Sequence, residues 1–336
     1  MKTRVVLSTI VLLCTLKATA QRYTPDILGT PFEQLTIQLS ADDEGERVAT
    51  LIRHGAPQST KAVLYVHGFN DYFFQREMAE QFTSHGYAFY AIDLQKYGRS
   101  LRPHQTRYQT YNIKEYFAEL DSAMAIIQSE GAHEVVMIGH STGGLITAHY
   151  IEARDGMPIL KGAIFNSPFF DWYLTGAIEG LTPIFSFAGR FAQRTVINGN
   201  EESVSQYGCS LHKAYRGEWE FDTDWKLIKG NVVRLGWIRM IEEAQQELQA
   251  GFRIRLPMLV MTSDSSSVEE GEWLERYTKN DIVLDRNDII RYAPCLGSDI
   301  TITTIPGGIH DLILSAPPVR RYAYEVIFSW LANKEL

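Results

Sequence analysis

Short, wholly apolar runs of residues alternate along this chain with longer segments that have helical periodicity. Strands that are apolar throughout are buried on both faces, which is typical of a parallel sheet covered by helices on each side. The sequence therefore predicts an α/β fold with a mostly parallel central sheet. The expected strands are a hairpin over 34–39 and 47–53, then 62–66, 87–92, 135–138, 163–165, 258–261 and 300–305. The clearest expected helices are 74–84, 113–129, 143–154 and 319–333.

Residues from about 169 to 254 interrupt this alternation. No strand is evident there, and the segment is rich in large aromatic side chains. We expect a helical insertion that caps the carboxyl ends of the sheet strands, where such folds bind ligands. Most of its aromatic residues are expected to build the insertion's own core: Trp172, Phe185, Phe187, Phe191, Trp219, Phe221, Trp225 and Trp237.

The first 20 residues predict a cleaved secretory signal peptide. Lys2 and Arg4 form a basic start, residues 5–16 are largely apolar, and Ala18 and Ala20 fit a small-x-small cleavage site. The apolar run is shorter than the ~20 residues that a membrane span needs. We therefore expect export to a periplasm or to the medium after cleavage near Ala20, with no stable membrane anchor. A single α/β domain over residues 21–336 is expected to remain.

Charge and cysteine content exclude some classes of protein. The formal net charge is −8 at pH 7 and there is no basic run, so nucleic acid is not an expected partner. Only Cys209 and Cys295 follow the predicted cleavage site. Two cysteines do not make a disulfide framework, and we expect buried free thiols rather than a bond.

Residues 139–143 read Gly-His-Ser-Thr-Gly, directly after an expected strand and at the start of an expected helix. This pattern forces its serine into a strained turn, and the glycines remove side chains that would collide there. The free N–H groups at the start of the helix can bind an anion. Ser141 is therefore the candidate nucleophile. His140 is expected to point away from it, and His149 to pack along the helix.

His67, Gly68 and Phe69 follow the expected strand 62–66. Acyl transfer requires preorganised donors for an oxyanion, each worth ~3 kcal/mol. At these positions the backbone N–H groups of Phe69 and Thr142 are the expected donors of an oxyanion hole.

Of the nine histidines, His310 alone lies after the last expected strand and before the last helix, in a glycine-rich loop. Such a loop at a strand end can present an imidazole to the serine hydroxyl. We therefore expect His310 to be the general base.

Three aspartates could orient this histidine. Asp264 follows the expected strand 258–261 most closely, whereas Asp281 and Asp285 lie after a polar stretch. Asp285 could also cap the short helix expected over 287–292. Asp281 is favoured, with Asp264 and Asp285 as alternatives.

Residues from about 30 to 334 resemble the monoacylglycerol-lipase and lysophospholipase branch of the α/β-hydrolases, also described as serine aminopeptidase-like. In that branch the acid is the first aspartate of a D-x-x-x-D segment about 30 residues before the histidine, a role that the resemblance carries to Asp281. The chain departs from the family between Ser263 and Asp281, where it has an insertion of roughly 16 residues. The matching motifs are His67-Gly68-Phe69, Asp93 with Gly98-Arg99-Ser100, Gly139 to Gly144, and Gly308-Ile309-His310-Asp311.

The resemblance implies an α/β-hydrolase fold and a serine hydrolase that cleaves carboxylic esters, with neither metal nor organic cofactor. The aromatic insertion favours a small-molecule or lipid ester, such as a monoacylglycerol or a lysophospholipid. A serine aminopeptidase is the alternative enzyme, and would need acids such as Glu201, Glu202, Glu218 or Glu220 to receive a substrate amine. A binding protein that has lost catalysis is the alternative outside enzymes.

Overall fold

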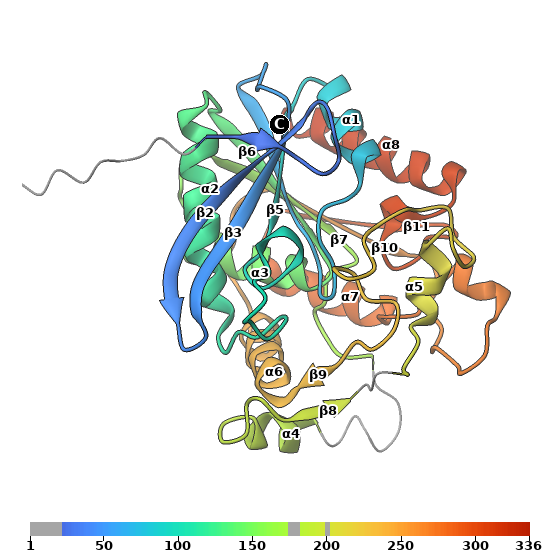
Figure 1. The fold of residues 1–336 in the computed structure, drawn as a ribbon. Helices are drawn as coiled ribbons and strands as arrows, with labels where there is room; N and C mark the ends of the chain where they lie inside the picture. Colours follow the sequence, from blue (N-terminus) through green and yellow to red (C-terminus); the bar gives the residue numbers. More distant parts are fainter. Residues whose placement is uncertain (1–21, 174–181, 199–201) are drawn as a thin grey trace, which may run out of the picture.

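The computed structural model describes residues 22–173, 182–198 and 202–336, and these form a twisted sheet flanked by helices (Figure 1). Nine strands lie in the order β1-β2-β3-β5-β4-β6-β7-β10-β11. The six from β5 to β11 run parallel, and β1, β2 and β3 add an antiparallel edge. The mostly parallel sheet predicted from the sequence is therefore confirmed.

The strands of the sheet lie where the apolar runs place them. Residues of β4 alternate between two cores: Val63 and Tyr65 face one, and Leu64 faces the other, as the two-residue period of a strand requires. The strands are β1 (Thr24–Pro25), β2 (Phe32–Asp42), β3 (Gly45–His54), β4 (Lys61–Val66), β5 (Ala88–Asp93), β6 (Glu134–His140), β7 (Leu160–Asn166), β10 (Met258–Ser263) and β11 (Ile300–Ile305).

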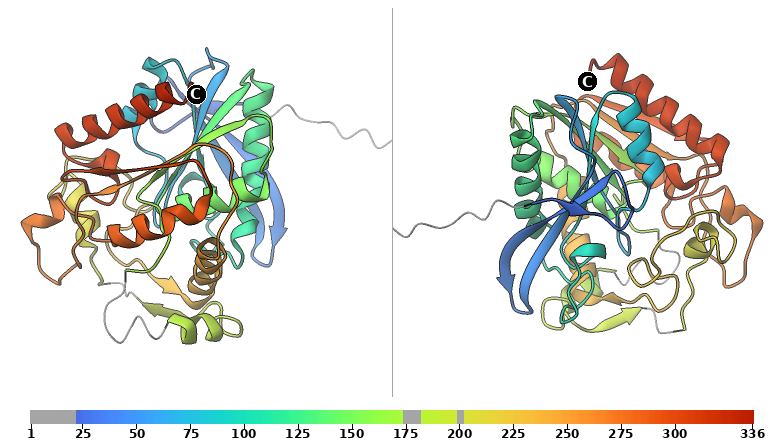
Figure 2. Two further views of the ribbon diagram at one scale, coloured as in Figure 1. Left: turned by 180° about the vertical axis from the view of Figure 1, so that it is seen from behind. Right: turned by 45° about the horizontal axis from the view of Figure 1, so that its top comes forward.

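Helices cover both faces of the sheet (Figure 2). On one face α1 (Arg76–Ser84) and α8 (Pro317–Asn333) share a core with the strands, and on the other face α2 (Phe117–Ser129) and α3 (Thr142–Ala153) do so. The shorter helices are α7 (Arg286–Tyr292) and the 3-10 turns η1 (Gly98–Ser100), η2 (Ile113–Tyr116), η4 (Glu275–Thr278), η5 (Ala293–Leu296) and η6 (Leu312–Leu314).

Between β7 and β10 the chain leaves the sheet and forms a cap below it in Figure 1. Its helices are α4 (Thr182–Ala188), α5 (Gln206–Leu211) and α6 (Leu235–Gln249), and its strands β8 (Val196–Asn198) and β9 (Val233–Arg234) pair antiparallel. The expectation that this segment has no strand is therefore wrong. Strands this short carry no readable periodicity, and their pairing depends on residues far apart in the sequence.

The aromatic residues of the cap divide into three groups, so the expectation of a single core for the insertion holds only in part. One group contacts the rings of Phe69 and Phe169, a second packs with Tyr72 and Phe74, and a third is exposed. They are, in that order, Trp172 with Trp237; Trp219 with Phe221 and Trp225; and Phe187 with Phe191.

Several expectations concern the remainder of the chain. The predicted signal peptide over residues 1–20 lies outside the described residues. Among the residues described, Cys209 and Cys295 are both free thiols, and only Cys209 is fully buried. Among the same residues, no helix has the length and apolar character of a membrane span.

Candidate active site

The turn between β6 and α3 holds Ser141 in a conformation that L-residues rarely adopt. Its backbone has φ 53° and ψ −121°, outside the regions open to residues with a side chain. The Ser141 N–H donates to the carbonyl oxygen of Asn166 at the end of β7, 3.1 Å away, and the Ser141 carbonyl accepts from Phe169 N–H. The neighbouring strand thus stabilises the strained turn, as expected at functional sites.

Glycines make this turn possible. A Cβ at Gly139 would lie 2.7 Å from the carbonyl oxygen of Gly143, and one at Gly144 would lie 2.8 Å from the Cβ of Pro168. A Cβ at Gly143 would overlap with the backbone of Val66 at the end of β4. Helix α3 therefore begins in direct contact with two strands of the sheet.

Gly143→Ala is accordingly expected to lower the free energy of unfolding by about 3 kcal/mol, because the added methyl group meets backbone that cannot rotate away. Urea denaturation followed by circular dichroism measures this loss. Gly271→Ala is the matched control: no atom lies within 4 Å of the added Cβ there, and the variant should unfold at the wild-type urea concentration. Equal stability of the two variants would contradict the tight packing of α3 on β4.

His310 and Asp281 are hydrogen bonded in the buried interior. The Nδ1 atom of His310 lies 2.9 Å from Oδ2 of Asp281, and both side chains are at most 3% exposed. The other carboxylate oxygen, Oδ1, accepts from the N–H groups of Val283 and Leu284, each at 2.8 Å. These bonds fix the carboxylate, so that Nδ1–H of His310 donates to it and Nε2 is left free to accept a proton.

The insertion before Asp281 begins at the end of β10 and returns to it. Ser266 and Asp281 form a bridge, in which Asp281 N–H donates to Ser265 and its carbonyl accepts from Ser267. The alternative acids make other bonds. Asp264 Oδ1 accepts from Gly307 N–H, and Asp285 caps α7 by accepting from Asn287 N–H.

The loop after β4 packs directly on the turn at Ser141. A Cβ at Gly68 would lie 3.0 Å from the Cβ of Ser141, so Phe69 follows at the closest approach of the two segments. Thr142 is the first residue of α3, where a backbone N–H has no acceptor within the helix. Burial lowers the pKa of His67, whose Nε2 accepts from Leu94 N–H. This neutral imidazole supports the loop.

Phe69, Ser141, Thr142 and His310 border one cavity of about 410 Å³ under the cap, whereas Asp281 is not among the lining residues. The lining combines apolar residues with polar and charged ones. The apolar lining includes Phe69, Phe169, Trp172, Val233, Trp237, Ile282 and Leu284; the polar lining includes Asn70, Asp71, Ser141, Thr142, Ser205, Tyr207, Lys226, Asn231, Glu269 and His310. A cavity with this mixed lining can hold a ligand that has both an apolar and a polar part.

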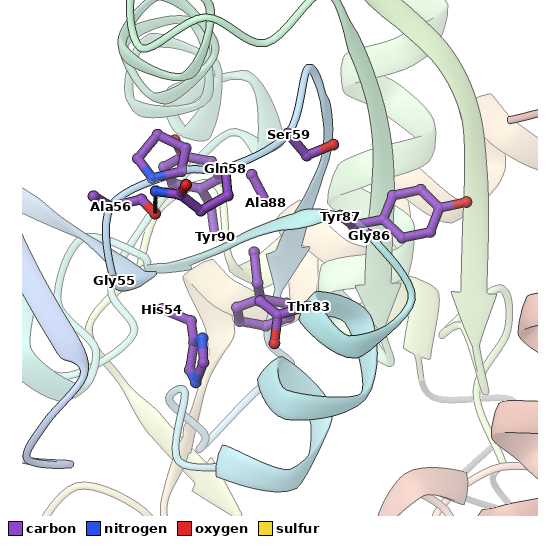
Figure 3. A pocket seen from close by; sticks show the side chains of 12 residues that line it. His54, Gly55, Ala56, Gln58, Ser59, Thr83, Gly86, Tyr87, Ala88 and Tyr90 are labelled. Carbon is purple, nitrogen blue, oxygen red and sulfur yellow. Dashed lines mark hydrogen bonds between the residues drawn. The ribbon is translucent and has the colours of Figure 1, made fainter.

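A second cavity, of about 200 Å³, lies between His54 and Tyr90, where β4 and β5 begin (Figure 3). Ligands of open α/β sheets bind at the carboxyl ends of the strands, and this cavity is at the opposite ends. Ser141, Asp281 and His310 are not among its lining residues. The cavity under the cap is therefore the candidate active site.

Two residues near His310, Asn166 and Tyr207, were not anticipated from the sequence. Asn166 Nδ2 donates to Asp311 Oδ1 at 2.6 Å, and the Asn166 carbonyl also faces Nδ1 of His140. Tyr207 packs its ring against His310, with the centroids 5.5 Å apart. A polar residue at the end of a buried strand, as Asn166 is, was the one signal available.

His140 was expected to point away from the site, and this is wrong. Its ring centroid lies 4.9 Å from that of His310, and it borders the cavity. The loop that carries His310 crosses the end of β10 and bonds to Asn166 at the end of β7, and Asn166 is paired with His140 at the end of β6. His149 packs as expected, with Nε2 2.9 Å from the Ala244 carbonyl of α6.

Potential metal-ligand atoms of Asp71, His140 and Asp311 lie within 4.8 Å of one another, a grouping that the sequence did not predict. Protein donors already occupy both carboxylates: Lys226 Nζ bonds to Asp71, and Asn166 Nδ2 bonds to Asp311. The residues thus form a buried polar network of their own.

A mostly parallel sheet covered by helices on both faces, with a strained serine at a strand-to-helix turn and a buried Asp–His pair, is typical of the α/β-hydrolase fold. The model of the family described as "Serine aminopeptidase, S33" matches residues 57–316. The chain belongs to this family of the α/β-hydrolase superfamily.

Solved structures support the fold. A soluble variant of monoglyceride lipase from Saccharomyces cerevisiae, in complex with a substrate analog, superposes with a TM-score of 0.66 at 18% identity, covering 89% of this chain and 96% of that one. Monoacylglycerol lipase of Paleococcus ferrophilus gives a TM-score of 0.60 at 16% identity over 90% and 99%. Est1E of Butyrivibrio proteoclasticus with ferulic acid bound gives 0.53 at 14% over 88% and 99%. No protein of curated function matches the sequence.

Proposed function

We propose that this protein is a serine hydrolase that cleaves carboxylic esters through an acyl-Ser141 intermediate. The observation that carries the proposal is the buried hydrogen bond between His310 Nδ1 and Asp281, beside a serine held at φ 53° in the same cavity. An imidazole oriented in this way can accept the proton of a serine hydroxyl, which makes the hydroxyl nucleophilic at neutral pH.

In the proposed reaction, Ser141 Oγ attacks the ester carbonyl carbon while its proton passes to Nε2 of His310. The carbonyl oxygen becomes an oxyanion, which the N–H groups of Phe69 and Thr142 stabilise. The C–O bond then breaks, and the leaving alcohol takes the proton from His310. Water attacks the acyl group with His310 as base, releasing the acid and restoring Ser141.

The substrate class rests on the mixed lining of the cavity. The aromatic residues, where Trp172 and Trp237 meet Phe169, suit an acyl chain, and the polar residues suit a hydroxylated or charged alcohol. Monoglyceride and monoacylglycerol lipases share the fold. Substrates of the monoacylglycerol or lysophospholipid type, or smaller esters, therefore fit best.

The test is hydrolysis of p-nitrophenyl esters, from acetate to palmitate, by the protein without residues 1–20, together with labelling by a fluorophosphonate. We expect release of p-nitrophenolate, and a fluorophosphonate adduct on the peptide that contains Ser141. The preferred acyl length would show how long an acyl chain the cavity accepts. A protein that hydrolyses none of the esters and remains unlabelled would be a binding protein, contrary to the proposal.

A serine aminopeptidase is the second candidate, because the family model carries that description. An acid is needed to receive the substrate amine. Of the acids expected from the sequence, Glu218 pairs with Arg320, and Glu220 pairs with Lys213. Glu202, Glu218 and Glu220 are not among the lining residues of the cavity, and Glu201 lies outside the described residues. Glu269 does border the cavity. Cleavage of aminoacyl p-nitroanilides faster than of esters, with a loss confined to the anilides in Glu269→Gln, would favour this candidate.

We also propose that the protein is exported after cleavage near Ala20. The proposal rests on the basic start, the short apolar run and the small residues at positions 18 and 20. Mass spectrometry of the mature protein should find Gln21 at the N-terminus, and an intact Met1 would overturn the proposal.

A further inference from the structure

Three consecutive residues of the loop after β4 are bonded to one segment of the cap, residues 222–227. Asn70 Nδ2 donates to the Leu227 carbonyl, and Asn70 Oδ1 accepts from Leu227 N–H, both at 2.8 Å. Lys226 Nζ donates to Asp71 Oδ1 at 2.7 Å, and Tyr72 Oη accepts from the backbone N–H at position 222, also at 2.7 Å. The cap is therefore hydrogen bonded to the loop that contains Phe69.

The bond between Lys226 and Asp71 is a buried ion pair. The two side chains are 6% and 1% exposed, and the ammonium lies about 5.8 Å from the ring centroids of Phe74 and Tyr207. The second carboxylate oxygen of Asp71 has no hydrogen-bond partner among the described residues. Lys226 thus provides the compensating charge for a nearly fully buried carboxylate.

Other charged and titratable groups face this carboxylate. Ligand atoms of His140 and Asp311 lie within 4.8 Å of those of Asp71. Burial lowers the pKa of His140, so this imidazole is neutral at pH 7 and offers no compensating charge. Without Lys226, Asp71 would be an unpaired buried carboxylate close to Asp311, an unfavourable state that moving toward water would relieve. Such a movement would displace the loop at the residue two positions after Phe69.

Phe69 itself is confined between the cap and the serine turn. Its ring lies 4.2 Å from that of Trp237 in α6 and 4.7 Å from that of Tyr108. Asn70, which follows it, has φ 49°, a conformation that asparagine tolerates and that its three side-chain bonds to Leu227 and Tyr108 maintain. The direction of the backbone N–H at Phe69 depends on these contacts.

We propose that Lys226 is a positioning residue of the oxyanion hole: by pairing with Asp71 it holds the loop so that Phe69 N–H points at the developing oxyanion. This proposal rests on the serine hydrolase function proposed above. Residues 222–227 accordingly stay on the loop throughout turnover, because lifting them would disassemble the hole. Substrate enters past other parts of the cap.

The test compares Lys226→Met, Asp71→Asn and the double variant with Lys229→Met, the same change at an exposed lysine three residues further along the chain. In Lys226→Met we expect kcat for a p-nitrophenyl ester to fall about 10- to 100-fold with KM nearly unchanged, since a misplaced donor affects the transition state alone. The inhibition constant of a trifluoromethyl ketone, which forms an oxyanion on Ser141, should rise by a similar factor. Lys229→Met should match the wild type.

The double variant should lose less activity than Lys226→Met alone, because removing both charges leaves no unpaired buried anion. Near-ultraviolet circular dichroism checks that each variant folds. If Lys226→Met does not fold, the double variant is compared with Asp71→Asn instead. In Asp71→Asn the lysine has lost its anion, so removing that lysine in the double variant should raise kcat. A KM that rises while kcat stays constant would mean that Lys226 binds substrate, and would overturn the proposal, as would a trifluoromethyl ketone constant that does not change. An inactive wild type would contradict the hydrolase function, whereas an active wild type with an equally active Lys226→Met would contradict only the role of Lys226.

Discussion

Ser141→Ala is expected to abolish ester hydrolysis, with kcat falling roughly 10⁴- to 10⁶-fold and the fold unchanged. Alanine keeps the Cβ that the turn already accommodates at φ 53° and removes only the Oγ atom that attacks the ester. KM should change little, since the apolar lining of the cavity remains in place. Initial rates with the best p-nitrophenyl ester, at high enzyme concentration, measure the loss.

Ser167→Ala provides the matched control. Ser167 is also fully buried and has a positive φ of 44°, and its Oγ has no hydrogen-bond partner among the described residues. Removing that oxygen costs no hydrogen bond, so wild-type activity is expected. Substantial activity in Ser141→Ala, or continued labelling of it by a fluorophosphonate, would show that another residue is the nucleophile.

Asp281→Asn is expected to lower kcat about 10³- to 10⁴-fold while the protein remains folded. Oδ1 of Asp281 accepts from two backbone N–H groups, so the carbonyl oxygen of an asparagine would occupy that position. Its amide nitrogen would then face Nδ1 of His310, where the carboxylate now accepts. Nδ1 would have to act as an acceptor, the ring proton would move to Nε2, and His310 could no longer take the proton of Ser141.

Asp285→Asn is the control for this change, four residues further along the chain. Asp285 caps α7, and asparagine caps helices about as well as aspartate, so both activity and Tm should stay close to those of the wild type. A larger loss in Asp285→Asn or Asp264→Asn than in Asp281→Asn would reassign the acid.

Local patterns in the sequence were sufficient for the fold class and for two residues of the candidate site. Buried parallel strands are largely apolar, so the six parallel strands could be located from their own residues, whereas the two-residue strand β1 was not expected. Ser141 and His310 could be located for a related reason: each follows a recognisable strand within a glycine-rich turn, and the sheet brings all carboxyl ends to one edge. The parallel sheet and its covering helices agree with these expectations.

Contacts between distant segments decided the rest. Three aspartates were compatible with the sequence, and only the bridge between Ser266 and Asp281 returns one of them to His310. No local pattern predicts strands β8 and β9, the approach of His140 to His310, or the pairing of Lys226 with Asp71. A sequence pattern reports the burial and conformation of neighbouring residues, whereas these contacts depend on how the cap folds back over the sheet, which only the tertiary structure specifies.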